Sequence, residues 1–139
     1  MRTAVVYESF SRKDKVESVV KGLVTGLEEQ GATVDCINLA LDRDKKLTSY
    51  SYIAFGISGP SGFSGKLPPT IISYLKNAGH LVGKRSFAFV LKQPLFSQKL
   101  LSSLMRAMES EGMFVKYSEI LSSTLEGKVV AKRLVLDKG

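Results

Sequence analysis

The sequence has few of the residues that form disulfides and most metal sites. It contains one cysteine, one histidine and no tryptophan. A single cysteine excludes an internal disulfide, and Cys36, within an apolar run, is predicted to be buried and unreactive. His80 has no cysteine partner and no acid near it in sequence, which favours a surface position over a catalytic role. Dinucleotide-binding, Walker, nucleophile-elbow and metal-ligand motifs are missing, so functions that depend on them are not predicted.

Long apolar runs are also missing. No run approaches the ~20 residues of a membrane span, and Thr3–Tyr7 is too short for the core of a signal peptide. A cytoplasmic protein without a membrane segment is therefore expected. The 139 residues are 44% hydrophobic, with charges of both signs and no low-complexity tract. That length and composition predict one ordered domain over residues 1–139.

Acidic residues are missing from the middle of the chain. The whole sequence has 20 Lys and Arg against 13 Asp and Glu, a formal net charge of +7. Residues 45–108 contain no acid, and their cations are Lys45, Lys46, Lys66, Lys76, Lys84, Arg85, Lys92, Lys99 and Arg106. Such a segment forms either an ordinary solvated surface or a positive face for a phosphate ligand, an acidic protein or nucleic acid. Nucleic acid is the weakest of these candidates, because no RNA-binding aromatic motif, zinc-finger spacing or basic recognition helix is present.

Short apolar runs alternate with amphipathic segments along the chain. The predicted strands are Thr3–Tyr7, Thr33–Asn38, Tyr52–Phe55, Ser86–Leu91 and Met113–Tyr117. Apolar residues at three- and four-residue steps predict helices after the first, third and fourth strands. This alternation predicts an α/β fold, in which helices cover both faces of a parallel sheet.

Three local patterns lead to further expectations. Gly22 and Gly26 weaken the first helix by ~1 kcal/mol each, and their spacing predicts that this helix approaches the sheet closely. Ser97 is predicted to cap the helix after the fourth strand. The final segment, residues 126–137, fits either a short helix or an added strand, and its periodicity does not decide between them.

The central stretch, residues 51–77, has the clearest organisation. Tyr52–Phe55 predicts a strand that is buried on both faces and ends at Gly56. Residues 56–65 then include four glycines, three serines and one proline. This composition provides many backbone N–H groups with little side-chain bulk, which suits a loop that wraps a flat ligand. Pro68 and Pro69 follow, at positions typical of the first turn of a helix.

The order strand, Gly-rich loop, Leu67-Pro68-Pro69 and helix resembles the third strand and flavin-binding loop of flavodoxins and related flavodoxin-like quinone reductases. The resemblance extends over the order of elements from Arg2 to about Tyr117. It implies a three-layer α/β/α fold, a strand order of 2-1-3-4-5 and FMN as the cofactor. It also implies that the usual second helix is short or lost, because the charged segment Asp42–Lys46 stands there, and it favours a helix at the C-terminal end.

The same resemblance places FMN among three loops at the carboxyl ends of the strands. The implied cofactor-binding residues are Ser9, Ser11, Arg12, Lys13, Ser58, Gly59, Pro60, Ser61, Gly62, Phe63, Lys92 and Gln93. The first loop lacks the Thr-Gly-Asn-Thr sequence of the family, so its phosphate-binding loop is degenerate. Arg12 and Lys13 either replace the lost donors with charge-assisted contacts or are solvated residues at the start of a helix.

Two functions of different classes remain open from the sequence. The first is an FMN-binding redox protein that transfers electrons or hydride to a protein or a small quinone. The second is a flavodoxin-like domain that has lost FMN and serves as a binding or assembly module. The sequence does not decide between an enzyme and an electron carrier, and it leaves the oligomeric state open. The cations favour an acidic redox partner or an anionic small molecule.

Overall fold

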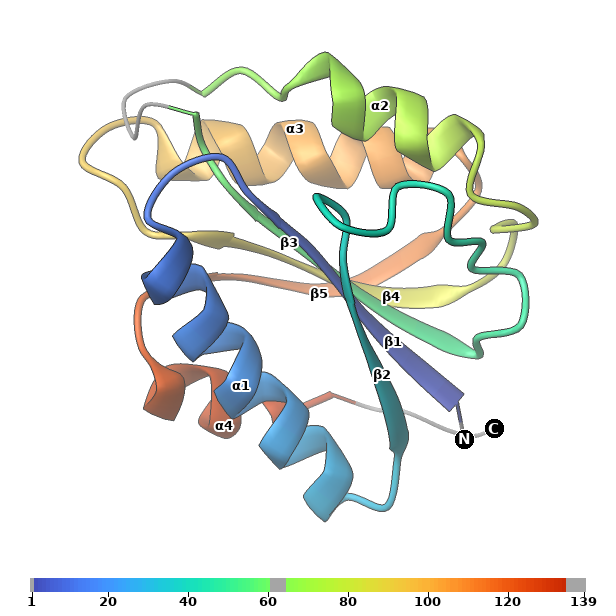
Figure 1. The fold of residues 1–139 in the computed structure, drawn as a ribbon, viewed down its shortest axis with the longest axis horizontal. Coiled ribbons are helices and arrows are strands. Elements are labelled where there is room, and N and C mark those ends of the chain that lie inside the picture. The colour runs from blue at the N-terminus through green and yellow to red at the C-terminus, as the bar shows by residue number, and fades with distance from the viewer. Residues whose placement is uncertain (1, 61–64, 135–139) are drawn as a thin grey trace.

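A parallel sheet forms the middle of the molecule. The computed structural model describes residues 2–60 and 65–134. All paired strands run parallel, in the order β2-β1-β3-β4-β5 (Figure 1). The strands are β1 (Arg2–Ser9), β2 (Thr33–Asn38), β3 (Tyr52–Ser58), β4 (Arg85–Leu91) and β5 (Phe114–Leu121). The predicted parallel sheet and its strand order are confirmed.

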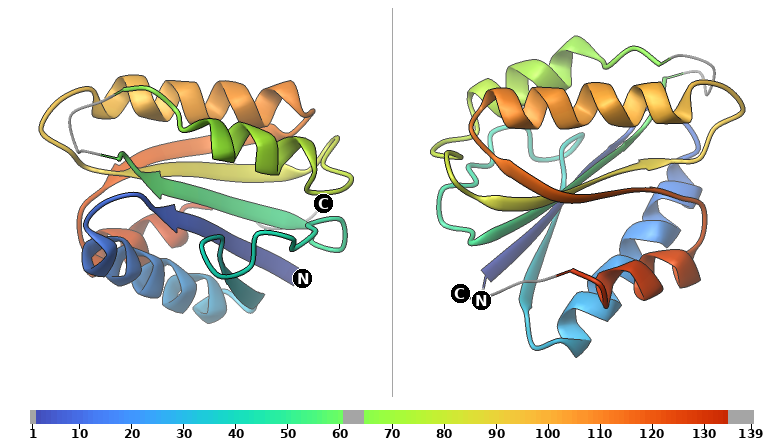
Figure 2. Two further views of the ribbon diagram at one scale, coloured as in Figure 1. Left: turned by 45° about the horizontal axis from the view of Figure 1, so that its top comes forward. Right: turned by 180° about the vertical axis from the view of Figure 1, so that it is seen from behind.

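Helices cover both faces of this sheet. Those in the described residues are α1 (Lys13–Glu29), α2 (Pro69–Lys76), α3 (Ser97–Ser110) and α4 (Thr124–Ala131). Figure 2 shows α1 and α4 against one face of the sheet and α2 and α3 against the other. The central strand β3 is covered on both sides, and all seven of its residues are buried. The predicted three-layer arrangement is therefore confirmed.

Gly56 lies inside β3 and does not end it, contrary to the prediction. The strand continues to Ser58, and its last residues pair with the last residues of β1. The ring of Phe89, on the neighbouring strand β4, occupies the space that a Cβ on Gly56 would need. A glycine inside a strand often marks such a close approach. The longer strand carries Ser58 to the edge of the sheet where the connecting loops meet.

The connection between β2 and β3 contains no helix, as expected. Residues 39–51 form turns and irregular backbone, but Leu39, Leu47 and Tyr50 are buried in the core on the α2 side of the sheet. The Tyr50 hydroxyl donates to the Asp35 carboxylate at 2.6 Å, and Arg2 donates to the same carboxylate at 3.1 Å. These two hydrogen bonds lower the pKa of Asp35. Side chains of the connection thus fill the core where a helix would otherwise pack.

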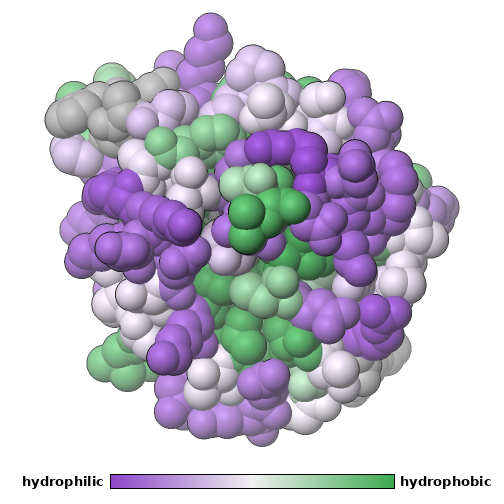
Figure 3. Space-filling view, viewed as in Figure 1, coloured by the Kyte–Doolittle hydropathy of each residue, from purple (hydrophilic) through white to green (hydrophobic). Residues whose placement is uncertain are grey.

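Cys36 is exposed, so the prediction of a buried cysteine is wrong. It lies on β2, which is an edge strand of the sheet and has a strand neighbour on one side only. Figure 3 shows apolar surface around β2, between hydrophilic side chains on either side. An apolar run in the sequence does not reveal whether its strand lies at the edge or in the centre of a sheet.

Gly22 and Gly26 face α4, and not the sheet as predicted. A Cβ on Gly22 would overlap the backbone carbonyl of Thr124. A Cβ on Gly26 would lie 2.5 Å from the Cβ of Ala131. The prediction of a close approach is therefore right, but its partner is a helix from the far end of the chain.

The C-terminal segment is helical, and its helix begins earlier than the sequence pattern indicated. The Ser123 hydroxyl accepts a hydrogen bond from the Glu126 N–H at 3.1 Å, which caps α4. The Glu126 carboxylate accepts from the Ser122 N–H at 2.6 Å. The Ser123 and Glu126 pair has the spacing of a capping box, which is a sequence signal for the start of a helix. The helical alternative is confirmed as far as Ala131, while residues 135–137 lie outside the described residues.

Candidate functional site at the carboxyl edge of the sheet

The three loops predicted to form the site leave the sheet at the same edge (Figure 1). They follow β1, β3 and β4, whose carboxyl ends lie together because the strands are parallel. From β1 the chain passes to β2 on one side of the sheet, whereas β3 and the later strands lie on the other side of β1. The direction in which strands are added therefore reverses at β1. Ligands of open α/β sheets bind at such a reversal of strand order. This edge is therefore the candidate functional site.

Ser58 joins the first loop to the end of β3. Its hydroxyl accepts hydrogen bonds from the N–H groups of Phe10 and Ser11 at 3.0 and 3.1 Å. It also donates to the Ser11 carbonyl at 2.7 Å. The Ser11 hydroxyl donates to the Gly59 carbonyl at 2.6 Å. The structure brings these predicted residues together, but it uses Ser11 and Ser58 to hold the two loops to each other.

Ser9 presents a different arrangement at the end of β1. Its hydroxyl oxygen is buried and has no hydrogen-bond partner among the described residues. A buried hydroxyl is normally hydrogen-bonded in proteins, so an exception next to a candidate site calls for an explanation. A ligand oxygen at the first loop would provide the missing partner.

The start of α1 is the part of the first loop that is open to an anion. Arg12 occupies the residue before the helix with φ 49°, and no side chain caps the first turn. First-turn N–H groups have no acceptor within their own helix, so those of Lys13 and Asp14 point out of the helix end. The side chains of Arg12 and Lys13 are exposed beside them. A helix N-terminus with two adjacent cations favours a negatively charged group.

The third loop is closed by Gln93. This side chain is buried, and its amide nitrogen donates to the Leu95 carbonyl at 2.6 Å. The Ser97 hydroxyl accepts from the Gln93 N–H at 2.9 Å and donates to the Gln93 carbonyl at 3.0 Å. α3 begins at Ser97 itself and has no side-chain cap, so the prediction that Ser97 caps the helix is wrong. Phe96 holds the cap position with φ 65°.

A pocket of about 300 Å³ lies between the first and third loops. Arg12, Lys92 and Gln93, all predicted site residues, line it together. Lys15 and Ser122 line it as well, although the sequence analysis did not include them. Lys15 follows Arg12 by three residues, about one helical turn, and Ser122 follows the fifth strand at the same edge. The three cations give the pocket a positive charge that suits a phosphate group.

The remaining predicted residues belong to the second loop. Gly59 is buried, and a Cβ there would lie 2.5 Å from the Gln93 side-chain oxygen. The second and third loops therefore touch at Gly59. Pro60 is exposed. Ser61, Gly62 and Phe63 lie outside the described residues.

An ion pair that the sequence analysis missed fixes the β2–β3 connection to this edge. Glu8, near the end of β1, is buried, and both of its carboxylate oxygens accept from Arg43 at 2.7 and 2.6 Å. This bidentate contact raises the pKa of Arg43, mainly through the hydrogen bond itself. The two residues lie in separate sequence segments without a shared motif, so only the fold reveals the pair.

We expect Arg43→Met to destabilise the protein by about 2 kcal/mol, because it leaves the buried Glu8 carboxylate without its charged partner. The value is below that of a fully buried pair because Arg43 is 45% exposed. Chemical denaturation of the wild type, Arg43→Met, Glu8→Gln and the double variant gives the coupling between the two side chains. Additive effects of the two substitutions would contradict the expected coupling.

Two other features were not found among the described residues. These residues include no group of three or more His, Cys, Asp or Glu side chains that could hold a metal ion. Among the same residues, no helix has the length and apolar character that crossing a membrane requires.

Solved structures share this architecture over nearly the whole chain. A flavodoxin from the domain Archaea is 21% identical and has a TM-score of 0.69, with 96% of this chain and 92% of that one covered. Flavodoxin 1 from Bacillus cereus is 14% identical with a TM-score of 0.71, covering 96% and 93%. The fold is that of a flavodoxin. The flavodoxin, WrbA-like protein from Agrobacterium tumefaciens is 16% identical with a TM-score of 0.59, covering 95% and 96%.

These similarities confirm the flavodoxin-like fold that the central stretch implied. At such identities they show the fold alone, and fold by itself does not determine function. Comparison of the sequence with protein-family models and with curated proteins found no match. The residues at the carboxyl edge of the sheet are therefore the main evidence for the function of this protein.

Proposed function

We propose that this flavodoxin-fold protein binds FMN at the carboxyl edge of its sheet and transfers electrons or hydride to a protein or a small quinone. The observation that carries the proposal is the positive site at the start of α1. There, an uncapped helix N-terminus, the exposed cations Arg12 and Lys13 and the 300 Å³ pocket lie next to one another. This combination of donors suits a phosphate dianion.

Two residues of the first loop have energetically unfavourable features, one in its backbone conformation and one in its hydrogen bonding. A bound ligand would explain both. Arg12 is in the left-handed region, which costs a residue with a side chain roughly 1–2 kcal/mol. The buried Ser9 hydroxyl has no partner among the described residues. Strained or unsatisfied groups in proteins cluster at ligand sites. Both features support a bound group at this loop.

In the proposal, each loop has a separate role. Arg12, Lys13 and the first-turn N–H groups of α1 bind the phosphate, and Ser9 donates its hydroxyl hydrogen to it. Lys92 and Gly59 border the space for the rest of the ligand, and buried Gln93 holds the third loop in place. The flavin ring, when bound, supplies the redox chemistry, while these residues bind and orient it.

A second function is favoured by one specific observation. The Ser58 hydroxyl already accepts hydrogen bonds from the N–H groups of Phe10 and Ser11, two backbone donors of the first loop. A loop whose donors are satisfied internally does not need a phosphate to be stable. This arrangement favours a flavodoxin-fold module that has lost FMN and serves in binding or assembly.

Titration with FMN separates the two proposals. If the protein is an FMN-binding redox protein, it should quench the fluorescence of added FMN and saturate near one FMN per chain. Riboflavin should bind less tightly, because it lacks the phosphate that the start of α1 contacts. No binding of FMN at roughly 100 μM protein would reject the redox proposal and support the module that has lost FMN.

A further inference from the structure

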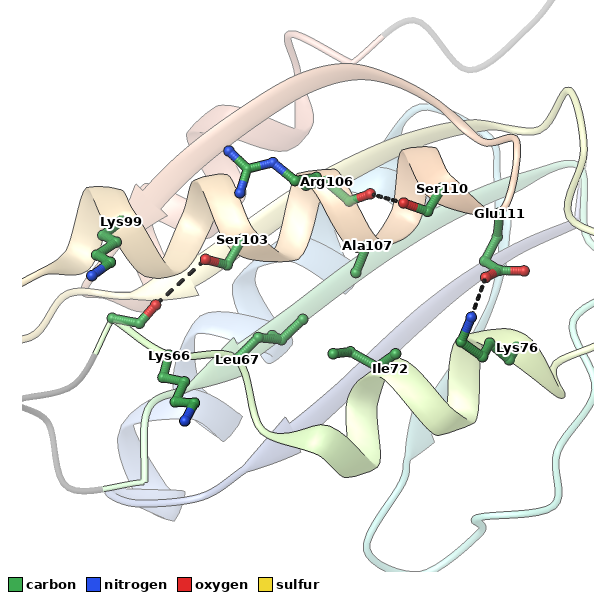
Figure 4. A pocket seen from close by; sticks show the side chains of 11 residues that line it. Lys66, Leu67, Ile72, Lys76, Lys99, Ser103, Arg106, Ala107, Ser110 and Glu111 are labelled. Atoms are coloured by element: carbon green, nitrogen blue, oxygen red, sulfur yellow. Dashed lines mark hydrogen bonds and ion pairs between the residues drawn. The ribbon is translucent and has the colours of Figure 1, made fainter.

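A groove of about 590 Å³ runs between α2 and α3, on the face of the sheet opposite α1 (Figure 4). Leu67, Ile72 and Ala107 point toward one another across it. Ile72 is 40% exposed, although it is a large apolar side chain. Ala107 offers only a methyl group from the α3 side. Leu67 is buried, and Ala107 is partly buried, so Ile72 contributes most of the exposed apolar surface. These three side chains form an apolar floor between the two helices.

Cations surround this apolar floor. Lys66 and Lys76 line the groove on the side of α2, and Lys99 and Arg106 line it on the side of α3. Lys76 lies at one end, 3.9 Å from the Glu111 carboxylate, and Figure 4 shows Lys99 at the opposite end. All four cations come from the acid-free segment of residues 45–108. The charge segregation seen in the sequence thus becomes one positive groove in the fold.

The polar groups of the groove do not converge on one point, as they would around a small anion. The Ser103 hydroxyl donates to the Gly65 carbonyl at 3.5 Å, and the Ser110 hydroxyl donates to the Arg106 carbonyl at 2.8 Å. α3 forms one wall, and α2 with the non-helical residues 65–67 before it forms the other. Residues 65–67 are not part of a strand, and helix backbone groups bond internally, so neither wall offers a strand edge to an extended peptide. These features favour a bound segment whose backbone N–H and C=O groups are hydrogen-bonded within the segment itself, as in a helix, and whose charges are spread along its length.

We propose that the groove between α2 and α3 binds an acidic amphipathic helix of a partner protein. The lining residues follow α3 from Lys99 to Ser110, a span of ~16 Å, which matches about three turns of a docked helix. Apolar side chains on one face of that helix would contact Leu67, Ile72 and Ala107. Its Asp and Glu side chains would meet cations on both walls of the groove. The proposal does not depend on FMN, because none of these residues belongs to the FMN site.

A synthetic peptide tests the proposal directly. The probe is a fluorescent helix of about 14 residues, with Leu at i, i+3, i+4 and i+7 and Glu on the opposite face. Fluorescence anisotropy should show saturable binding to the wild type. Lys99→Glu together with Arg106→Glu should weaken binding roughly tenfold or more. Ala107→Leu, which fills the groove without changing its charge, should weaken binding to a similar degree.

Matched controls distinguish docking from general charge attraction. Lys116→Glu with Lys132→Glu reverses the same number of exposed cations outside the groove, and it should change the affinity by less than about twofold. A peptide of the same composition, with its Leu residues spread around the helix, should bind more weakly than the probe. Thermal unfolding of each variant confirms that the fold is intact.

Several results would overturn the proposal. One is no binding at about 1 mM peptide, and another is equal weakening by the two charge-reversal pairs. Competitive displacement of the probe by inorganic phosphate would assign the groove to a small anion. Self-association of the wild type that Ala107→Leu abolishes would assign it to a second copy of the chain.

Discussion

Replacing Arg12 by Gly and Lys13 by Ala should weaken FMN binding by about 30-fold and make the protein more stable. Each exposed cation that contacts the phosphate contributes ~1 kcal/mol, less than a buried charge-assisted hydrogen bond, and together they account for about 30-fold in affinity. Gly at position 12 also removes the strain of the left-handed backbone, worth about 1 kcal/mol. Isothermal titration and chemical denaturation measure the two effects.

The opposite signs of these effects make the result specific. A protein that is more stable than the wild type cannot have lost FMN because it unfolded. Riboflavin, which has no phosphate, should lose less than about threefold in affinity. As a matched control, Lys21→Ala with Lys132→Ala removes two exposed cations away from the site and should leave FMN binding unchanged. Equal losses for FMN and riboflavin would show that Arg12 and Lys13 do not contact the phosphate.

The layers and the strand order could be predicted because they depend on patterns within short segments. An apolar run such as Ser86–Leu91 is typical of a strand covered on both faces, and the structure buries every residue of this run in β4. Leu67-Pro68-Pro69 marked the start of α2 correctly. Local patterns do not report which residues of different strands become neighbours. The prediction that Gly56 ends a strand is therefore wrong, because the glycine makes room for the Phe89 ring of the next strand.

The sequence predicted which loops form the candidate site. It did not predict the side-chain contacts between those loops. The resemblance correctly brought the segments of Ser11, Ser58 and Gln93 to one edge. It could not show that Ser58 bonds to the first loop, because that contact depends on β3 extending to its position. The Glu8 and Arg43 pair was missed for the same reason, since its residues meet only when the β2–β3 connection folds back over β1.

Gly22→Ala should lower the free energy of unfolding by about 2–3 kcal/mol, a large effect for a single methyl group. Alanine gains ~1 kcal/mol in helix propensity. Its Cβ, however, would overlap the backbone carbonyl of Thr124, and that carbonyl cannot rotate away as a side chain can. Separating α1 from α4 to relieve this overlap loses apolar contacts along both helices. Thermal unfolding should show Tm lowered by about 10 °C.

Two further substitutions in α1 calibrate this result. Gly26→Ala should cost less than Gly22→Ala, because its overlaps are smaller. Its Cβ would lie 2.5 Å from the Cβ of Ala131 and 2.8 Å from the Lys128 carbonyl oxygen, against 1.9 Å between a Gly22 Cβ and the Thr124 carbonyl oxygen. Ser18→Ala, on the exposed face of the same helix, should change stability by less than about 0.5 kcal/mol. The expected order of destabilisation is therefore Gly22, Gly26, Ser18. If Gly22→Ala instead stabilised the protein, helix propensity would outweigh the overlap, and α4 could not lie as close to α1 as the structure shows.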